Sequence, residues 1–155
     1  MFFIYIVVSY FCWAYIHEYC HLYALKQIRN VKSYKFRLYP HNHDELGFVF
    51  ASVSYDYDKV LNKKEWAYVS FAPRIANYVA VFSFSFACMF VNIIPEMYAV
   101  FMLCCSVDLL RGSYSRNNTA DIERYCEGWN LNKNRVVAIQ VLVAFLNFLL
   151  LYVYY

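Results

Sequence analysis

The segment FCWAYIHEYCHLYAL, residues 11–25, places His17, Glu18 and His21 inside an apolar stretch that begins at Met1. Residues four apart share one face of a helix, so the two imidazoles can bind the same ion while Glu18 lies beside them. Two histidines at this spacing, with a glutamate after the first, are typical of a zinc site in which the glutamate is the general base. The segment therefore predicts a helix that carries a metallopeptidase-like zinc site.

The composition indicates a membrane protein. Hydrophobic residues make up 62% of the 155 residues, the mean hydropathy is positive and only three glycines are present. A single water-soluble core of this size cannot bury so much apolar surface. The 17 tyrosines and 14 phenylalanines fit the same class, because amphipathic rings gather at membrane interfaces, as at the tyrosine-rich residues 152–155.

Four apolar segments approach the length that a bilayer requires. They cover residues 2–25, residues 66 or 69 to 94, residues 97–110 and residues 136–155. The third is short for a full span, and Pro95 breaks or kinks the helix before it. We therefore predict a mainly α membrane fold with about four transmembrane helices, forming a single domain over residues 1–155. The first segment is expected to be a retained span, because it lacks the basic start and cleavage site of a signal peptide.

The basic residues suggest how these spans are oriented. All 14 Lys and Arg fall in two groups, nine from Lys26 to Arg74 and five from Arg111 to Arg135. Because Lys and Arg are enriched in cytoplasmic loops, we expect both long loops in the cytoplasm and both termini on the other side. The predicted protein is therefore an integral, multi-pass membrane protein.

Zinc requires a third protein ligand, and Asp108 is the predicted one. A carboxylate inside an apolar span is costly unless it has a partner or a function. In the four-span topology Asp108 reaches the depth of His17 and His21, which leaves the fourth coordination position for water. Asp121 is the alternative, although the Asn, Ser and Thr residues before it are typical of a turn or a helix cap, with Thr119 as the capping residue.

Three segments, in this order, carry a resemblance to a known family: His17-Glu18-Tyr19-Cys20-His21, Phe71-Ala72-Pro73-Arg74-Ile75-Ala76-Asn77 and Ser106-Val107-Asp108-Leu109. The chain resembles the zincin peptidases, small multispan membrane proteins related to the site-2 proteases. The resemblance extends over residues 4–129 and implies a zinc endopeptidase-like fold with Asp108 as the third ligand. Val107 departs from the pattern, because the family has glycine in the corresponding Gly-Asp-Leu segment.

A cytoplasmic β-hairpin is predicted between the first two helices. Residues 34–39 alternate weakly, and residues 47–55 are rich in β-branched and aromatic side chains. The hairpin can hold a peptide substrate as an added strand along Phe48, Val49 and Phe50, as the resemblance also implies, or it can simply cover the helices. Asn77 is a further candidate for binding the substrate backbone, with contact to another helix as its structural alternative.

The second histidine pair and the cysteines give no indication of a further functional site. His41 and His43 have the spacing of a metal pair on a strand, but histidines in a polar turn are common and no metal is expected there. The six cysteines are interpreted as structural, because five lie in apolar helices and their spacing is not that of a disulfide framework or a thiolate zinc site. No nucleic-acid signature is present.

Two function classes stay open at the level of sequence. In the first, a membrane-embedded zinc metallopeptidase cleaves a peptide or a membrane protein within or beside the bilayer, with Glu18 activating the water. In the second, the same residues form a non-catalytic metal-binding site or a proton or metal relay. The substitution Glu18→Gln separates the two, because only hydrolysis depends on the general base.

Overall fold

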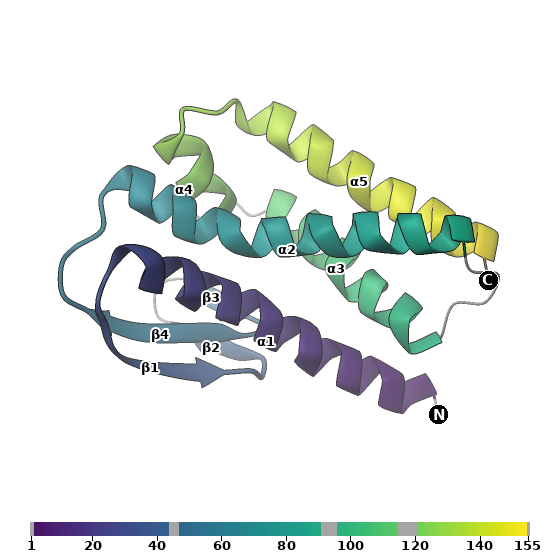
Figure 1. Ribbon diagram of the computed structural model, residues 1–155, viewed down its shortest axis with the longest axis horizontal. Helices are drawn as coiled ribbons and strands as arrows, with labels where there is room; N and C mark the ends of the chain where they lie inside the picture. The colour runs from purple at the N-terminus through teal and green to yellow at the C-terminus, as the bar shows by residue number, and fades with distance from the viewer. Residues whose placement is uncertain (1, 44–46, 91–95, 115–120, 155) are drawn as a thin grey trace.

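The structure is a computed structural model that describes residues 2–43, 47–90, 96–114 and 121–154. Five helices and four strands lie within these ranges (Figure 1). In chain order they are α1 (Phe2–Ile28), β1 (Val31–Arg37), β2 (His41–His43), β3 (Gly47–Val49), β4 (Ser52–Tyr57), α2 (Lys63–Phe90), α3 (Glu96–Tyr114), α4 (Asp121–Gly128) and α5 (Lys133–Tyr154).

The elements form two parts that meet along α1. On one side of α1 lie the strands, and on the other side α2 packs along its length (Figure 1). The short helix α4 packs on the first half of α2, α3 packs on both α1 and α5, and α5 also contacts α2. Helices α1, α2, α3 and α4 and the strand region therefore surround a common interior, which the polar residues of each can reach.

The strand region lies where the sequence predicts it, between α1 and α2, but it is longer than one hairpin. Strand β1 pairs antiparallel with β4, with Tyr34 opposite Tyr55, and β2 pairs antiparallel with β3, with His41 opposite Val49. Aromatic and β-branched residues favour this pairing. The hydroxyl of Tyr10 on α1 donates to the carbonyl of Phe50 at 2.5 Å and so ties the strands to the first helix.

The ends of α2 and α4 are fixed by local hydrogen bonds. At the start of α2, Asn62 Oδ1 accepts from the Glu65 amide at 3.0 Å, and Glu65 Oε2 accepts from the Asn62 amide at 2.9 Å, which is a reciprocal capping box. At the end of α4, Asn130 has a φ of 54°, and the Leu131 amide donates to the Cys126 carbonyl at 2.8 Å. A left-handed residue after a helix is a common stop signal, and asparagine tolerates this conformation.

Apolar side chains bind the helices together in separate clusters. One lies among α2, α3 and α5 and includes Phe84, Met102, Leu109 and Ala144, all completely buried. Another joins α4 to α2 and includes Ile122 and Tyr125 of α4 and Ala67 of α2. The contact between these two helices is close at Gly128, where an added Cβ would lie 2.3 Å from the backbone oxygen of Lys63. Glycine is therefore required at this crossing.

The prediction of four transmembrane helices is wrong. Among the described residues, one helix, Lys133–Val153, is long and apolar enough to cross a bilayer. Helices α1, α2 and α3 fail because they carry ionised or strongly polar side chains, among them Glu18, Arg74 and Asp108, which they bury against one another. The multi-pass localisation and the cytoplasmic placement of both long loops depend on those spans, so they are corrected as well.

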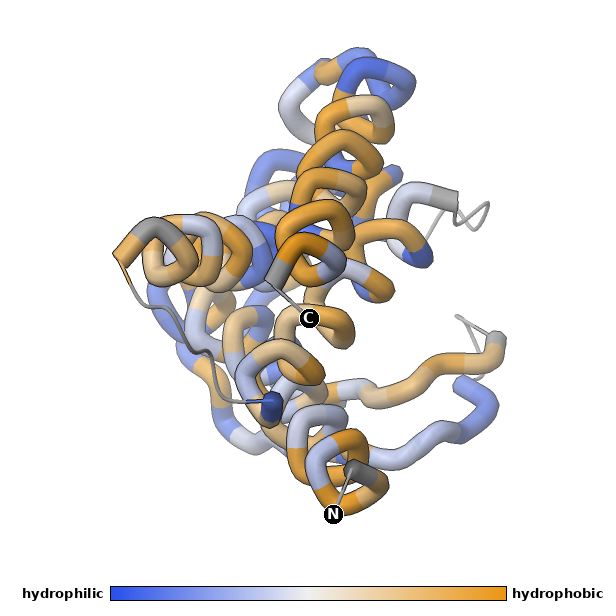
Figure 2. Tube along the Cα trace, turned by 90° about the vertical axis from the view of Figure 1, so that its right-hand side faces the viewer, coloured by the Kyte–Doolittle hydropathy of each residue, from blue (hydrophilic) through white to orange (hydrophobic). Residues whose placement is uncertain are grey.

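Apolar residues nevertheless cover much of the outer surface. On α5, exposed large side chains recur every three or four residues, namely Ile139, Leu142, Phe145, Leu149 and Val153. Figure 2 shows the tube of α5 coloured hydrophobic along most of its length up to the C-terminus. A contiguous apolar stripe of this kind marks a surface that contacts another apolar medium or partner.

Candidate metal centre

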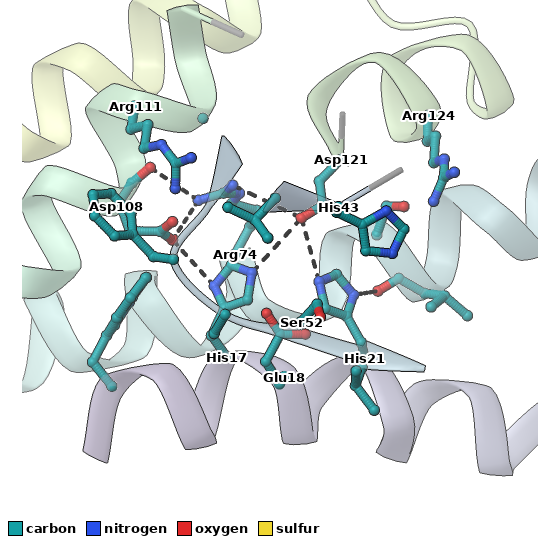
Figure 3. A pocket seen from close by; sticks show the side chains of 18 of the residues that line it. His17, Glu18, His21, His43, Ser52, Arg74, Asp108, Arg111, Asp121 and Arg124 are labelled. Atoms are coloured by element: carbon teal, nitrogen blue, oxygen red, sulfur yellow. Dashed lines mark hydrogen bonds and ion pairs between the residues drawn. The ribbon is translucent and has the colours of Figure 1, made fainter. Parts of the chain in front are cut away.

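The three residues of the first motif lie where the sequence predicts them, on one helix and facing one cavity. His17, Glu18 and His21 all belong to α1, and the imidazole centroids of the two histidines are 5.1 Å apart. They line a cavity of about 250 Å³ whose other walls are residues of α2, α3, α4 and the strand region (Figure 3). The predicted helical spacing of the motif is thus present in the structure.

Asp121, the first residue of α4, completes a group of three potential metal ligands with the two histidines. Its Oδ2 lies 3.3 Å from His21 Nε2 and 3.7 Å from His17 Nε2. One ligand atom from each of the three residues lies within 4.8 Å of the others. The polypeptide therefore brings a carboxylate from α4 to two imidazoles that are about 100 residues earlier in the chain.

The spacing of these atoms fits a zinc ion. Zinc bonds to imidazole nitrogen and carboxylate oxygen are about 2.0–2.1 Å long, so neighbouring ligands of a tetrahedral ion are roughly 3.3 Å apart. The two histidine–aspartate distances, 3.3 and 3.7 Å, lie close to that value. Three protein ligands leave one position open, which is the arrangement of catalytic rather than structural zinc sites.

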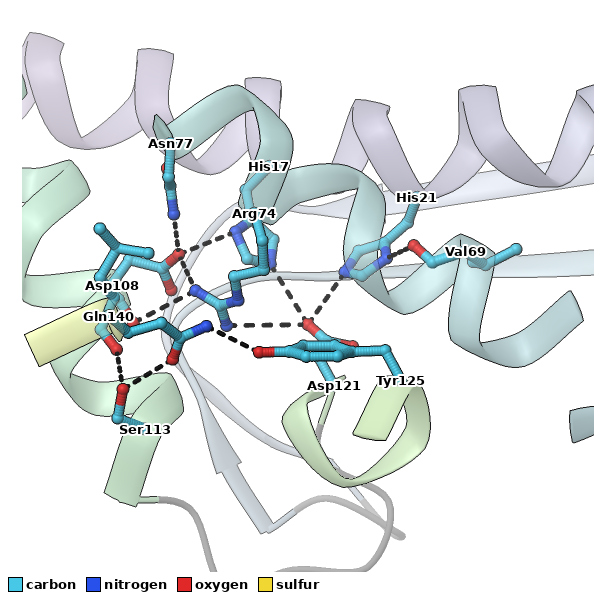
Figure 4. Close-up of polar contacts among 11 residues, drawn as sticks. His17, His21, Val69, Arg74, Asn77, Asp108, Ser113, Asp121, Tyr125 and Gln140 are labelled. Atoms are coloured by element: carbon cyan, nitrogen blue, oxygen red, sulfur yellow. Dashed lines mark hydrogen bonds and ion pairs between the residues drawn. The ribbon is translucent and has the colours of Figure 1, made fainter. Parts of the chain in front are cut away.

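The ring of His21 is oriented by a carbonyl that a proline makes available. Its Nδ1 contacts the Val69 carbonyl at 2.9 Å, which places Nε2 toward Asp121 (Figure 4). In a regular helix the Val69 carbonyl would accept from the amide of residue 73. Residue 73 is Pro73, inside α2, and it has no N–H. The free carbonyl of α2 thus fixes the tautomer that leaves His21 Nε2 available as a ligand.

The ring of His17 is oriented by Asp108. Its Nδ1 is buried and lies 3.3 Å from Asp108 Oδ2, an ion-pair contact without hydrogen-bond geometry. The same oxygen accepts from Arg74 Nη1 at 2.6 Å and from Asn77 Nδ2 at 2.5 Å. Figure 4 shows this carboxylate on the far side of His17 from Asp121. A carboxylate behind a metal-binding histidine is a common way to orient the ring and raise its basicity.

Asp108, the predicted third ligand, lies outside this group of three. Among the described residues, the group whose ligand atoms lie together is His17, His21 and Asp121, whereas Asp108 Oδ2 contacts His17 Nδ1, Arg74 and Asn77. The alternative from the sequence, Asp121, takes its place. Asn77, a candidate for substrate contact, is buried and donates to Asp108, so the structure places it behind the site rather than in the cavity.

The charges of the site are strongly coupled. Burial opposes the charge on His17, but the carboxylates of Asp108 and Asp121 outweigh it and raise the pKa of the imidazole to about 10. Burial likewise opposes the charge on Asp121, but His21, His17 and Arg74 outweigh it and hold the pKa of that carboxyl well below its ordinary value. In the metal-free protein, protons on the imidazoles therefore balance the carboxylates, the role that a bound cation would take.

Glu18 has the environment of a general base. Its side chain lines the cavity and is 7% exposed. Burial raises the pKa of this carboxyl, the two imidazoles lower it, and the net shift is upward. A raised pKa lies closer to neutral pH, and a general base removes a proton from water most effectively when its pKa is near the working pH.

The predicted substrate residues Phe48, Val49 and Phe50 line the same cavity, in and just after β3. Of the second histidine pair, His43 also lines the cavity. Both ring nitrogens of His41 have partners. These partners are the Tyr39 carbonyl at 2.7 Å and the Ser52 hydroxyl at 3.0 Å. His41 is thus occupied by structural contacts.

Sequence reasoning missed three arginines that line the cavity: Arg74, Arg111 and Arg124. Arg74 lies between Pro73 and Asn77 in the segment that carries the resemblance to the zincin peptidases. Its position in that segment could have marked it as a residue of the site. Arg111 and Arg124 carry no local pattern of their own, because only the packing of α3 and α4 brings them to the cavity.

No family model, curated protein or solved structure matches this chain. The resemblance to the zincin peptidases therefore stays a prediction, and the function has to be argued from the site itself.

Proposed function

We propose that this protein is a zinc-dependent peptidase in which His17, His21 and Asp121 bind the ion and Glu18 is the general base. The observation that carries the proposal is the convergence of two imidazole Nε2 atoms and one carboxylate at ligand spacing, beside a buried glutamate. The resemblance from the sequence supports the same chemistry, with Asp121 in the place of Asp108.

The roles of the chain's own residues follow from their surroundings. A zinc ion bound here would lower the pKa of water and polarise a peptide carbonyl. Glu18 takes the proton of the attacking water and then gives it to the leaving amine, so that the peptide bond is replaced by a carboxyl and an amino group. Asp108 and the Val69 carbonyl hold the two imidazoles in position throughout. The strand region supplies the wall of the cavity along which a peptide would lie.

The test is the substitution Glu18→Gln in purified, zinc-loaded protein. We expect hydrolysis of a fluorescent casein substrate to fall about 10²- to 10⁴-fold, because the general base is lost. Zinc per chain should stay unchanged, because Glu18 is not a ligand. Glu127→Gln is the matched control, since Glu127 is exposed and lies outside the cavity. Undiminished hydrolysis in Glu18→Gln would refute the catalytic role.

A second candidate function rests on a different observation. His17 lies between two carboxylates, with Nδ1 toward Asp108 and Nε2 toward Asp121. Such a chain of acid, imidazole and acid can pass a proton or hold a metal without hydrolysing anything. A protein that binds zinc but shows no hydrolysis, with or without Glu18, would favour this non-catalytic function.

A lipid bilayer stays a proposed partner, through the apolar stripe of α5 rather than through several spans. The stripe defined by Ile139, Leu142, Phe145, Leu149 and Val153 is exposed. Vesicle flotation tests the contact: wild-type protein should float with phosphatidylcholine vesicles, and a variant with Leu142 and Phe145 replaced by serine should float less. Equal flotation of the two proteins would exclude this surface.

A further inference from the structure

Two arginines from different helices line the cavity of the candidate metal centre. Arg111 comes from α3 and Arg124 from α4, and both line the cavity. Figure 3 shows them toward opposite ends of the view, with His17, Glu18 and His21 between them. Both guanidinium groups therefore belong to the lining of the cavity that contains Glu18, on two different helices.

Neither guanidinium forms an ion pair within the described parts of the chain. Arg111 donates one N–H to the Phe48 carbonyl at 2.9 Å and lies over the ring of Phe50, 4.3 Å from its centroid. Arg124 lies over the ring of Trp66, also 4.3 Å from the centroid. A guanidinium has five N–H donors in one plane, and a ring against its face leaves the edges of that plane available.

Arg74, in contrast, is a buried arginine whose charge is paired with a carboxylate. It is 3% exposed and its Nη1 donates to Asp108 at 2.6 Å. Arg29, outside the cavity, is likewise paired with Glu65 at 2.6 Å. Arg111 and Arg124 differ from both, because aromatic rings rather than carboxylates hold them in place. Among the residues that the structure describes, neither of these two charges has a carboxylate partner.

The charges of the described cavity lining point in the same direction. Its described lining includes three acidic side chains, Glu18, Asp108 and Asp121, and three arginines, Arg74, Arg111 and Arg124. These balance, so a divalent ion at the metal centre leaves an excess of two positive charges. A concave surface with this excess attracts and orients anionic ligands.

We propose that the cavity selects acidic peptides, in which carboxylate side chains on the two sides of the scissile bond bind Arg111 and Arg124. This inference rests on the proposed peptidase function and adds the class of substrate. Arginine is suited to the role, because its planar donors match both oxygens of a carboxylate.

The test uses binding and hydrolysis in parallel, so that the two proposals can fail separately. Two labelled peptides, one of alternating alanine and glutamate and one of alternating alanine and glutamine, are titrated onto zinc-loaded Glu18→Gln protein. Fluorescence anisotropy should show the glutamate peptide binding about tenfold more tightly at low salt, with the preference falling as salt is added. The same two peptides are offered to protein with Glu18 intact, and cleavage is followed by mass spectrometry.

Variants locate the effect. Arg124→Gln and Arg111→Gln, each made in the Glu18→Gln protein, should each weaken binding of the glutamate peptide about three- to tenfold and leave the glutamine peptide unchanged. Arg135→Gln is the matched control, because Arg135 is exposed on α5 and does not line the cavity. Arg111→Gln can disturb the strand that Arg111 contacts through Phe48. In that case Arg124→Gln alone tests the inference.

The outcomes are distinct. Equal binding of the two peptides, or an equal loss in Arg135→Gln, would overturn the inference. If both peptides are cleaved at equal rates, the peptidase proposal stands and the acidic preference is refuted. If the glutamate peptide binds selectively through Arg124 but no peptide is cleaved, the binding preference stands and the peptidase proposal fails.

Discussion

Replacing Pro73 by alanine should weaken zinc binding while leaving the stability of the metal-free protein nearly unchanged. Proline inside a helix costs about 3 kcal/mol relative to alanine, and the rigidity of proline in the unfolded chain offsets about 1 kcal/mol of that. The Pro73 side chain is fully buried, so the loss of its ring methylenes costs about 1–2 kcal/mol more, and the net change in the free energy of unfolding should stay below about 1 kcal/mol. A loss of metal affinity without a loss of stability is not expected from a general disturbance of the fold.

The loss of affinity follows from the competition for one carbonyl. Alanine at position 73 has an amide that bonds to the Val69 carbonyl, which in the native chain contacts His21 Nδ1 at 2.9 Å. A hydrogen bond of this kind is worth about 0.5–1.5 kcal/mol, which corresponds to a roughly two- to tenfold weaker zinc affinity when it is lost. Without this hydrogen bond, the His21 ring would lose rotational freedom when the ion binds, and this loss weakens the affinity.

Two measurements check this prediction. Urea unfolding in the presence of a chelator gives the stability of the metal-free protein, and competition with a chromophoric chelator gives the zinc affinity. Pro40→Ala is the control, because Pro40 lies between β1 and β2, outside every helix. Unchanged zinc affinity in Pro73→Ala would refute the role assigned to the Val69 carbonyl.

Three further predictions concern the surroundings of the site. Gly128→Ala should lower the free energy of unfolding by about 1–3 kcal/mol, measured in urea, because its Cβ would lie 2.3 Å from the Lys63 carbonyl oxygen. Gln140→Ala should cost about 2–4 kcal/mol, because Gln140 joins the hydroxyls of Ser113 and Tyr125, and a double-mutant cycle with Tyr125→Phe should show coupling. Removing zinc with a chelator should lower the melting temperature of wild-type protein, and a saturating hundredfold excess of zinc over its dissociation constant should restore about 2.7 kcal/mol. A melting temperature that ignores the chelator would contradict a folded-state metal site.

The local part of the site was predictable from the sequence. His17, Glu18 and His21 are close in the chain, and helical spacing alone places the two imidazoles on one face. The strand region was also predictable, because aromatic and β-branched residues are concentrated between α1 and α2. In both cases the signal lies within a few residues, the range over which sequence patterns act directly.

The third ligand was not predictable in the same way. Asp108 was chosen because it lies in an apolar segment, where a carboxylate needs a partner. In the structure that partner is Arg74, a residue of another helix, whose Nη1 lies 2.6 Å from Asp108 Oδ2. Asp121 begins α4, and an aspartate at this position commonly stabilises a helix N-terminus. Its local sequence therefore favoured a capping role, which is why Asp121 was only the alternative ligand.

The membrane prediction failed for a related reason. Composition counts apolar residues but does not show which of them pack against each other. In α2 the first turn carries Lys63 and Glu65, and in the middle of the helix Arg74 and Asn77 donate to Asp108 of α3. Among the described helices, only α5 is long and apolar enough to cross a bilayer.

The most direct test of the whole account is the zinc content and zinc affinity of three proteins: wild type, Asp121→Asn and Asp108→Asn. We predict one zinc per wild-type chain, loss of that zinc in Asp121→Asn, and retention in Asp108→Asn with an affinity about 10- to 100-fold weaker, as for a residue that orients a ligand. Wild-type zinc content and affinity in Asp121→Asn would contradict the assignment of the metal centre.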